Sequence, residues 1–184
     1  LKILCTIHYS DIDKISVVNK KLSSLNLKLE NNSNNKVLLK DFIYNNFERG
    51  KRLVKGRELY RDHGNVKVIS STTTGPMGYY TESNYSLKGN DFVYSIDGAN
   101  AGYISLYKPQ EVFITDHAGV ISIKEEYVKK YGRLAISLFL QDYFIKQRTT
   151  GTQPTFLLKN NLNLILDLNK LGALSEVVTD ELLL

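Results

Sequence analysis

The sequence is poor in cysteine, methionine and proline and has no tryptophan: its 184 residues include one Cys, one Met and three Pro. A disulfide needs two cysteines, so Cys5 alone excludes an internal disulfide framework, and it cannot complete a zinc site by itself. This usage is typical of a reducing compartment, and we expect a cytoplasmic protein. No apolar run reaches the ~18 residues needed to cross a bilayer, so we expect no membrane-spanning segment and no membrane partner.

Motifs for the common catalytic and cofactor-binding chemistries are also missing. A metal-dependent nuclease of the common kind needs an acidic residue two positions before a lysine, and the sequence has no such pair. It lacks the glycine-rich loops that bind dinucleotides or nucleoside triphosphates, and the Asn-Pro-Pro-aromatic signature of adenine methyltransferases. His8, His63 and His117 stand in no metal-binding frame. We therefore predict a protein with no catalytic residue, no metal and no cofactor.

Positive charge and tyrosine are what the sequence has in excess. Lysine and arginine number 24 against 19 acidic residues, which gives a formal net charge of +5, and there are 12 Tyr. A basic balance favours a polyanionic partner, and tyrosine, with its flat apolar face and its hydroxyl, suits polar interfaces. The apolar content of 42% is enough for the core of one ordinary domain.

The N-terminal part of the chain has the pattern of an amphipathic helix. After a capping-box-like start at Ser10–Asp13, apolar residues recur at spacings of three or four, at Ile12, Ile15, Val18, Leu22, Leu25 and Leu29. A lone helix with one apolar stripe must dock on another helix, so we expect contact with the C-terminal segment or self-association. The asparagine-rich tract at 31–35 is a linker. Residues 1–35 thus form a helical appendage with its linker, ahead of the main domain.

The rest of the chain alternates short strands with turns and ends in helices. Strand-like segments at spacings of about ten residues lie at 66–70, 91–96, 102–107, 112–115 and 120–123. Opposite charges four residues apart over 125–130 are typical of an exposed helical surface. The period is helical from Arg133 to Gln147, and 160–169 suits a strand or the approach to a final helix. We predict an α/β (α+β) domain with an irregular mixed β-sheet over 36–168, and a C-terminal helical segment over 169–184.

The stretch Val66–Tyr80 begins like a buried strand and then continues with five consecutive hydroxyl side chains, a Gly-Pro turn and two tyrosines. It is too polar for a core and too rich in β-branched residues for a flexible linker. Two interpretations remain open: a surface that contacts a partner, or a hydroxyl-rich turn that hydrogen-bonds its own backbone.

Five segments, taken in their order along the chain, resemble the target-recognition domain of type I restriction-modification specificity subunits and of the related type IIG and IIB specificity proteins. They are Phe47–Arg52, Val68–Tyr79, Gly89–Gly102, Phe113–Val120 and Thr149–Phe156. The resemblance implies an α/β recognition domain with a twisted sheet, joined to helices that act as spacer and dimerisation arm. Residues 1–30 and 169–184 would be stubs of those arms. It also implies sequence-specific recognition of double-stranded DNA for a separate methyltransferase subunit, which a restriction subunit can join.

The resemblance implies two kinds of DNA contact, and chemistry assigns residues to each. Side chains that donate and accept at base edges are Ser71, Thr72, Thr73, Thr74, Met77, Tyr79, Tyr80, Gln147, Arg148 and Gln153. Side chains placed to hold phosphates are Lys51, Arg52, Lys55, Arg57, Arg61, Thr149 and Thr150.

Two other classes of function remain open at this point. A hydrolase or nuclease would be built around Asp97, Asp116 and His117, with Asp116-His117 as half of a nucleophilic triad. No serine elbow accompanies them, so a polar loop at a strand end is the simpler interpretation. A carbohydrate- or protein-binding β module would use the tyrosines as a platform. The segment Asp97–Gly102 could be mistaken for a phosphate loop, but its glycines favour a β-turn.

Overall fold

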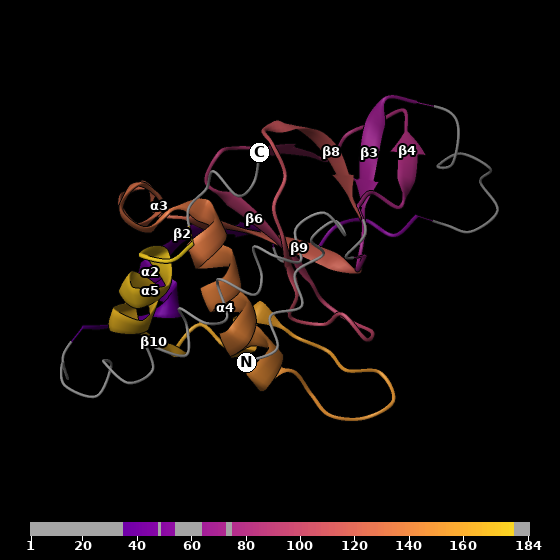
Figure 1. Ribbon diagram of the computed structural model, residues 1–184. Helices are drawn as coiled ribbons and strands as arrows, with labels where there is room; N and C mark the ends of the chain where they lie inside the picture. Colours follow the sequence, from indigo (N-terminus) through magenta and orange to yellow (C-terminus); the bar gives the residue numbers. More distant parts are fainter. Residues whose placement is uncertain (1–34, 48, 54–63, 73–74, 179–184) are drawn as a thin grey trace.

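The computed structural model describes residues 35–47, 49–53, 64–72 and 75–178 (Figure 1). The helix predicted over 11–30 and nearly all of the linker at 31–35 lie outside the described residues. So do five of the predicted DNA-contacting residues, which are Lys55, Arg57, Arg61, Thr73 and Thr74. Among the described helices, none combines the length and the apolar character that crossing a bilayer requires.

A central antiparallel sheet organises the domain. Its strands follow the order β2 (Ile43–Phe47), β9 (Ala118–Ile123), β6 (Asp91–Ser95) and β7 (Ile104–Ser105). Every residue of β6 and β9 is buried, which is expected of strands covered on both faces and explains their nearly continuous apolar runs. The two faces of this sheet therefore support two separate cores.

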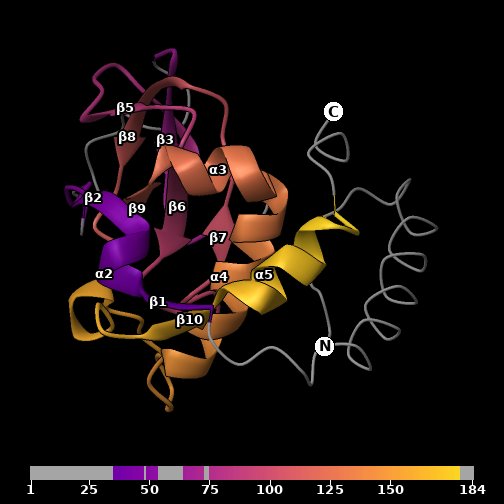
Figure 2. The ribbon, with the colours of Figure 1, turned by 90° about the vertical axis from the view of Figure 1, so that its left-hand side faces the viewer.

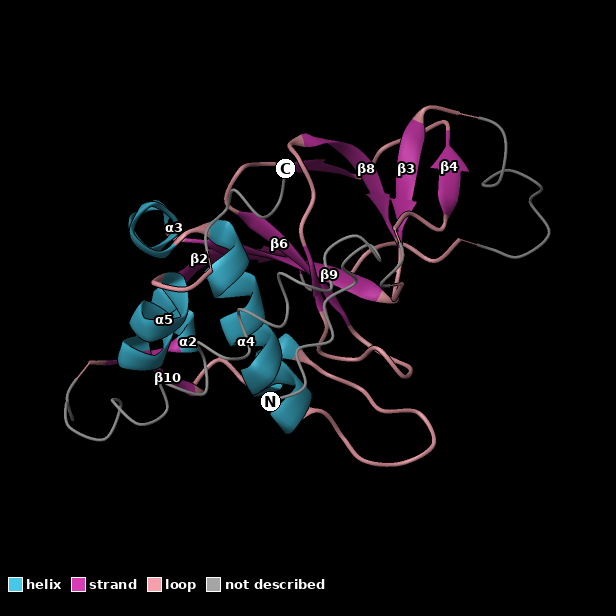
Figure 3. Ribbon diagram, in the orientation of Figure 1, coloured by secondary structure: helices cyan, strands magenta, loops and turns pink. Residues whose placement is uncertain are grey.

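Helices cover one face of the central sheet (Figures 2 and 3). They are α2 (Leu39–Phe42), α3 (Glu125–Tyr131), α4 (Arg133–Gln147) and α5 (Leu168–Ser175). The main core forms here, where Phe92, Tyr94 and Ile121 of the sheet pack with Phe139 and Phe144 of α4. A two-stranded ribbon of β1 (Lys36–Leu38) and β10 (Ile165–Asp167), and the short 3₁₀ helix η3 (Leu158–Asn160), complete this layer.

A second, distal sheet packs toward the other face of the central sheet. Its order is β4 (Gly78–Tyr80), β3 (Val66–Ile69), β8 (Gln110–Ile114) and β5 (Tyr85–Leu87). β3 and β8 are parallel, whereas the other pairs are antiparallel. Ile69 and Ile114 of this sheet meet Val93 and Val120 of the central sheet in a smaller core. The parallel pair gives β3 and β8 a common carboxyl end, which positions the candidate site.

The α/β (α+β) class with mixed β-sheet structure is confirmed, with two four-stranded sheets and a two-stranded ribbon in place of the single irregular sheet expected from the strand spacing. Each strand-like segment predicted over 66–123 contains a strand, and α4 spans the predicted Arg133–Gln147. The segment 160–169 contains both a strand, β10, and the start of a helix, α5. The strand predicted over 102–107 is shorter, because the backbone there is still in a turn up to Gly102.

The described part of the C-terminal segment packs on the main domain. Asp167 caps α5 by accepting a hydrogen bond from the Asn169 backbone N–H at 3.0 Å. Leu168 and Leu171 belong to the main core, and Val178 is also buried. The boundary predicted between 168 and 169 thus falls at the first residues of α5, whose apolar stripe already has a partner in α4.

Candidate nucleic-acid interface

Polar loops leave β3 and β8 at the same edge of the distal sheet, because the two strands are parallel. The last residues of each strand are apolar, Val68 and Ile69 in β3 and Val112 to Ile114 in β8, and the next residue in each case carries a hydroxyl. The buried Ser70 Oγ and Thr115 Oγ1 lie 3.0 Å apart across this edge. Ligands of sheets with parallel strands commonly bind beyond the carboxyl ends of those strands. This edge is therefore the candidate binding site of the domain.

The turn Asp97–Gly102, between β6 and β7, reaches the same edge and is the β-turn predicted from the sequence. Gly98 and Gly102 have φ of 76° and 85°, which glycine adopts without the strain of a Cβ. The Ala101 N–H donates to the Gly98 carbonyl at 3.0 Å. A Cβ on Gly102 would lie 2.9 Å from the Phe144 backbone, so this glycine also lets the turn approach α4.

This turn joins the hydroxyl loop at 70–77 to the loop that follows α4. Ser71 Oγ donates to the Asp97 carbonyl at 2.5 Å, and Asn100 Nδ2 donates to the Ser71 carbonyl at 2.9 Å. From the other side, Arg148 Nη1 donates to the Ala99 carbonyl at 3.2 Å. Two of the predicted base-reading segments, which are far apart in the sequence, are therefore held to one another through the turn.

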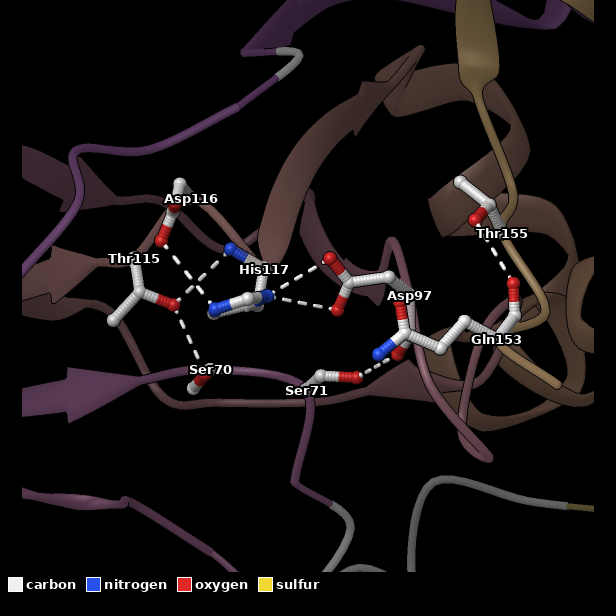
Figure 4. A network of polar contacts seen from close by, with 8 residues as sticks. All are labelled: Ser70, Ser71, Asp97, Thr115, Asp116, His117, Gln153 and Thr155. Carbon is white, nitrogen blue, oxygen red and sulfur yellow. Dashed lines mark hydrogen bonds and ion pairs between the residues drawn. The ribbon is translucent and has the colours of Figure 1, made fainter.

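Hydrogen bonds join the two ends of the loop 148–155, and the loop also pairs with the turn Asp97–Gly102. The Thr149 N–H donates to the Thr155 carbonyl at 2.9 Å, and Thr149 Oγ1 accepts from the Thr155 N–H at 2.9 Å. Asp97 and Thr155 form an isolated antiparallel β-bridge. Part of the hydrogen-bonding capacity of Thr149 is thus used inside the loop, whereas Gln147, Thr150 and Gln153 are exposed. In Figure 4 the Gln153 side chain points toward the Asp97 end of the network.

The basic segment at 49–52 runs along the end of β8. The Lys51 N–H donates to the Ile114 carbonyl at 3.0 Å, and the Gly50 N–H donates to the Ala118 carbonyl at 3.2 Å. The side chains of Lys51 and Arg52 are exposed and form no ion pair with any carboxylate of the described residues. Two predicted phosphate-binding residues therefore lie at the same edge as the loops, with their charges available.

Ser71 and Thr72, next to β3, support the hydroxyl loop, whereas Met77 and Tyr79, toward and in β4, are exposed. Thr72 Oγ1 donates to the Gly75 carbonyl at 2.6 Å and Ser71 is half-buried, so both hydroxyls support the loop itself. This is the second of the two interpretations drawn from the sequence, although each oxygen can still accept a hydrogen bond. Met77 and Tyr79 are exposed. Tyr80 lies opposite Val66 at the far end of β3, with its ring 5.1 Å from that of Phe113.

His117, in the turn between β8 and β9, lies between two carboxylates (Figure 4). Its Nδ1 is 2.8 Å from both carboxylate oxygens of Asp97, and its Nε2 is 3.6 Å from Asp116 Oδ1. A nucleophilic triad needs Nε2 to face a hydroxyl or thiol, whereas here it faces a second carboxylate. Within the described residues, no group of three or more His, Cys, Asp or Glu could hold a metal ion. The arrangement thus gives no support to a hydrolase or a nuclease.

Sequence reasoning named the loops but missed the residues that hold them together. Asn100 and Thr115 were not candidates, and Asp97 and His117 were considered only for catalysis. Each lies inside one of the five segments that carry the family resemblance. The signal that could have identified them is the change from apolar to polar residues at the ends of β6 and β8.

Comparison with known proteins supports the fold. No family model and no curated protein matches the sequence. The structure is similar to the S subunit of a type I restriction-modification system from M. genitalium, with a TM-score of 0.56, 17% identity, and coverage of 80% of this chain and 39% of that chain. It is also similar to the HsdS subunit from Thermoanaerobacter tengcongensis, with a TM-score of 0.55, 9% identity, and coverage of 89% and 44%.

A further similar structure comes from work on complex assembly and conformational transition of the type I R-M system, with a TM-score of 0.56 and 8% identity. It is matched over 89% of this chain and 45% of its own. The chain thus spans less than half the length of these solved chains. The likeness confirms the fold that the resemblance predicted, which is similar to that of type I specificity subunits.

Proposed function

We propose that this protein recognises a specific sequence in double-stranded DNA and directs a partner methyltransferase or endonuclease of a restriction-modification system to it. The observation that carries the proposal is the convergence of the loops at one edge of the distal sheet, in a fold similar to that of type I specificity subunits. Under this proposal the chain supplies recognition, and the reaction belongs to the partner subunit, with no cofactor bound by this chain.

The residues of the converging loops fall into two groups, one suited to phosphates and one suited to base edges. Lys51 and Arg52 are exposed cations on a segment fixed by its backbone, which suits phosphate contacts that position the protein without reading sequence. Arg148, Gln153 and Gln147 carry groups that pair with guanine or adenine in bidentate fashion. The turn at 97–102 joins the hydroxyl loop to Arg148, and the segment with Lys51 and Arg52 is bonded to the end of β8 at the same edge. This arrangement would let one duplex contact both groups at once.

The predicted helices at the two ends of the chain would supply the arms of this recognition unit. Because the chain spans less than half of the similar solved chains, we propose that 36–168 is the recognition domain. The helical appendage at 1–35 would join it to a methyltransferase subunit or to a second copy, and the C-terminal segment at 169–184 would contribute through its outer face. A restriction subunit would join the same assembly.

Selection from a pool of random duplexes tests this proposal. The chain is incubated with the pool, alone and together with a methyltransferase subunit of a restriction-modification system, and the bound duplexes are sequenced after several rounds. We expect enrichment of one defined sequence, strongest in the presence of the partner. Uniform recovery of all sequences in both cases would contradict sequence recognition. Binding to glycans or to proteins with no effect of salt would instead support the β-module alternative, because phosphate contacts weaken steeply as salt increases.

A further inference from the structure

We propose that Asp116 and His117 form a pair of hydrogen-bond acceptors that reads the exocyclic amino group of an adenine or a cytosine in the DNA target. This inference rests on the proposed function and adds to it the chemical identity of one recognised base. Neither residue is among the base-reading candidates drawn from the sequence. Both lie in the turn between β8 and β9, at the edge where the loops converge.

Asp97 determines which nitrogen of His117 carries the proton. Nδ1 lies 2.8 Å from each oxygen of the Asp97 carboxylate, and a carboxylate only accepts hydrogen bonds. When the ring is neutral, this contact keeps the proton on Nδ1, so that Nε2 presents a lone pair. The imidazole is 52% exposed, so this second nitrogen can be reached from outside.

Nε2 then faces a second acceptor. Asp116 Oδ1 lies 3.6 Å from it, beyond the length of a hydrogen bond. No side chain or backbone N–H of the described residues donates to the Asp116 carboxylate, which is 26% exposed. Two acceptors at this separation are satisfied together when a donor from outside inserts its N–H between them. The pair is thus shaped for a donor that none of the described residues supplies.

The DNA chemistry that fits this pair is narrow. A carboxylate is repelled by phosphates, so it does not contact the backbone of the duplex. In the major groove the hydrogen-bond donors are the N6 amino group of adenine and the N4 amino group of cytosine. The nearby Lys51 and Arg148 are donors only, and they suit phosphates or guanine. Asp116 and His117 therefore add hydrogen-bond acceptors to a surface on which Lys51 and Arg148 supply donors.

Asp97 is a positioning residue in this arrangement. Its carbonyl accepts from Ser71 Oγ at 2.5 Å, and it bridges Thr155 in the loop after α4. The orientation of the imidazole is therefore tied to both reading loops. Replacing Asp97 by Asn would put a donor opposite Nδ1 and move the proton to Nε2, which turns the acceptor into a donor without changing the shape of the side chain.

Base analogues test the inference directly. The probe is the duplex enriched by the protein with its methyltransferase partner, remade with each adenine in turn replaced by purine and each cytosine by 2-pyrimidinone, which lack only the amino group. We expect wild-type affinity to fall by about 5- to 150-fold at one position. Asp116→Asn and Asp97→Asn should weaken binding to the unmodified duplex by a similar factor and should no longer respond to the analogue at that position.

Glu125→Gln is the matched control, because it removes one exposed carboxylate on α3 and should respond to the analogues as wild type does. The inference is overturned if Asp116→Asn keeps the wild-type response to every analogue, even with a lower melting temperature. Asp116 would then be only an ion-pair partner of a protonated His117. It is also overturned if wild type loses no affinity with any analogue, while an enriched sequence still supports the proposed function. If no sequence is enriched, the proposed function fails first.

Discussion

Gly50 brings the basic segment against the end of β8 because it has no side chain. A Cβ at this position would overlap the backbone carbonyls of Ile114 and Thr115, which are part of the sheet and cannot move aside cheaply. The N–H groups of Gly50 and Lys51 both donate to backbone carbonyls there. The placement of Lys51 and Arg52 at the candidate interface thus depends on one glycine.

Gly50→Ala is expected to destabilise the protein by about 1–3 kcal/mol, because the new methyl group forces a shift of backbone in a packed region. Chemical denaturation at equilibrium measures the change. Gly89→Ala is the matched control, since a Cβ there would meet nothing within 4 Å. Equal stability of the two variants would show that the close approach at Gly50 is relieved without cost.

Asn100 holds the turn Asp97–Gly102 to the hydroxyl loop through its side chain. Asn100→Ala removes the donor to the Ser71 carbonyl, and we expect a loss of about 1 kcal/mol of stability together with reduced discrimination between the preferred duplex and unrelated duplexes. Competition binding and thermal unfolding measure the two effects. Asn163→Ala, an exposed asparagine in the loop before β10, is the control. Unchanged discrimination would mean that the loops read DNA without being held by the turn.

The distal sheet is held on the central sheet by a small core, so its stability depends on few side chains. Ile69 and Ile114 are fully buried there and meet Val93 and Val120 from the opposite sheet. Ser70 and Thr115 follow these isoleucines directly. The small core and the candidate interface are therefore adjacent along both strands. The core includes the last residue of β3 and of β8, and the interface begins at the residue that follows.

Ile114→Ala should cost about 2–5 kcal/mol of unfolding free energy, because a fully buried Ile leaves a cavity when it is truncated. Urea denaturation provides the measurement. The control is Ile165→Ala in β10, where the side chain is 56% exposed and little change is expected. If both variants lost the same small amount, the distal core would contribute little to global stability and the sheet would open on its own.

The longer and more strongly patterned elements could be predicted from the sequence, and the short ones could not. α4 has a clear helical period, and β6 and β9 are mainly apolar, apart from Asp91, Ser95 and Ser122, because both of their faces are buried. The strands β4 and β5 have three residues each in a polar, tyrosine-rich stretch. They exist because they pair with β3 and β8, and pairing partners distant in sequence leave no local signal.

The loops of the candidate site could be predicted from the sequence, but the contacts that join them could not. The order of the five segments identified 68–79, 89–102 and 149–156 as parts of one family pattern. The contact of Asn100 with Ser71 depends on how the predicted turn after β6 lies against the end of β3, and this placement leaves no local signal. For the same reason the sequence joined His117 and Asp97, twenty residues apart, only in the hydrolase alternative and did not indicate their hydrogen bond.

At the scale of the whole molecule, the location of the basic residues matters more to the proposed DNA binding than the size of the net charge of +5. Lys51 and Arg52 lie at the loop edge, whereas Lys129 is on α3 and Lys159 is in η3, both in the helical layer. Phosphate contacts should therefore come from the first pair and not from the second.

Neutralising Lys51 and Arg52 to Gln should weaken binding to all duplexes alike and should reduce the salt dependence by roughly one unit of slope per lost contact. Fluorescence anisotropy over a range of salt concentrations gives the slope. The control replaces Lys129 and Lys159 by Gln. It changes the net charge by the same amount and should leave the slope of the salt dependence nearly unchanged. Equal slopes in the two variants would place the phosphate contacts elsewhere.

The central claim is that the converging loops read bases, and Gln153 tests it most directly. Its exposed side chain makes none of the hydrogen bonds that hold the loops, so its removal leaves the framework intact. Random-duplex selection is repeated with Gln153→Ala and with the control Asn163→Ala, each with the methyltransferase partner. The account predicts that Gln153→Ala loses about 1–3 kcal/mol of discrimination at one or two positions and keeps the rest of the preferred sequence. A sequence preference identical to that of wild type, or a uniform loss of affinity with no change in preference, would contradict it.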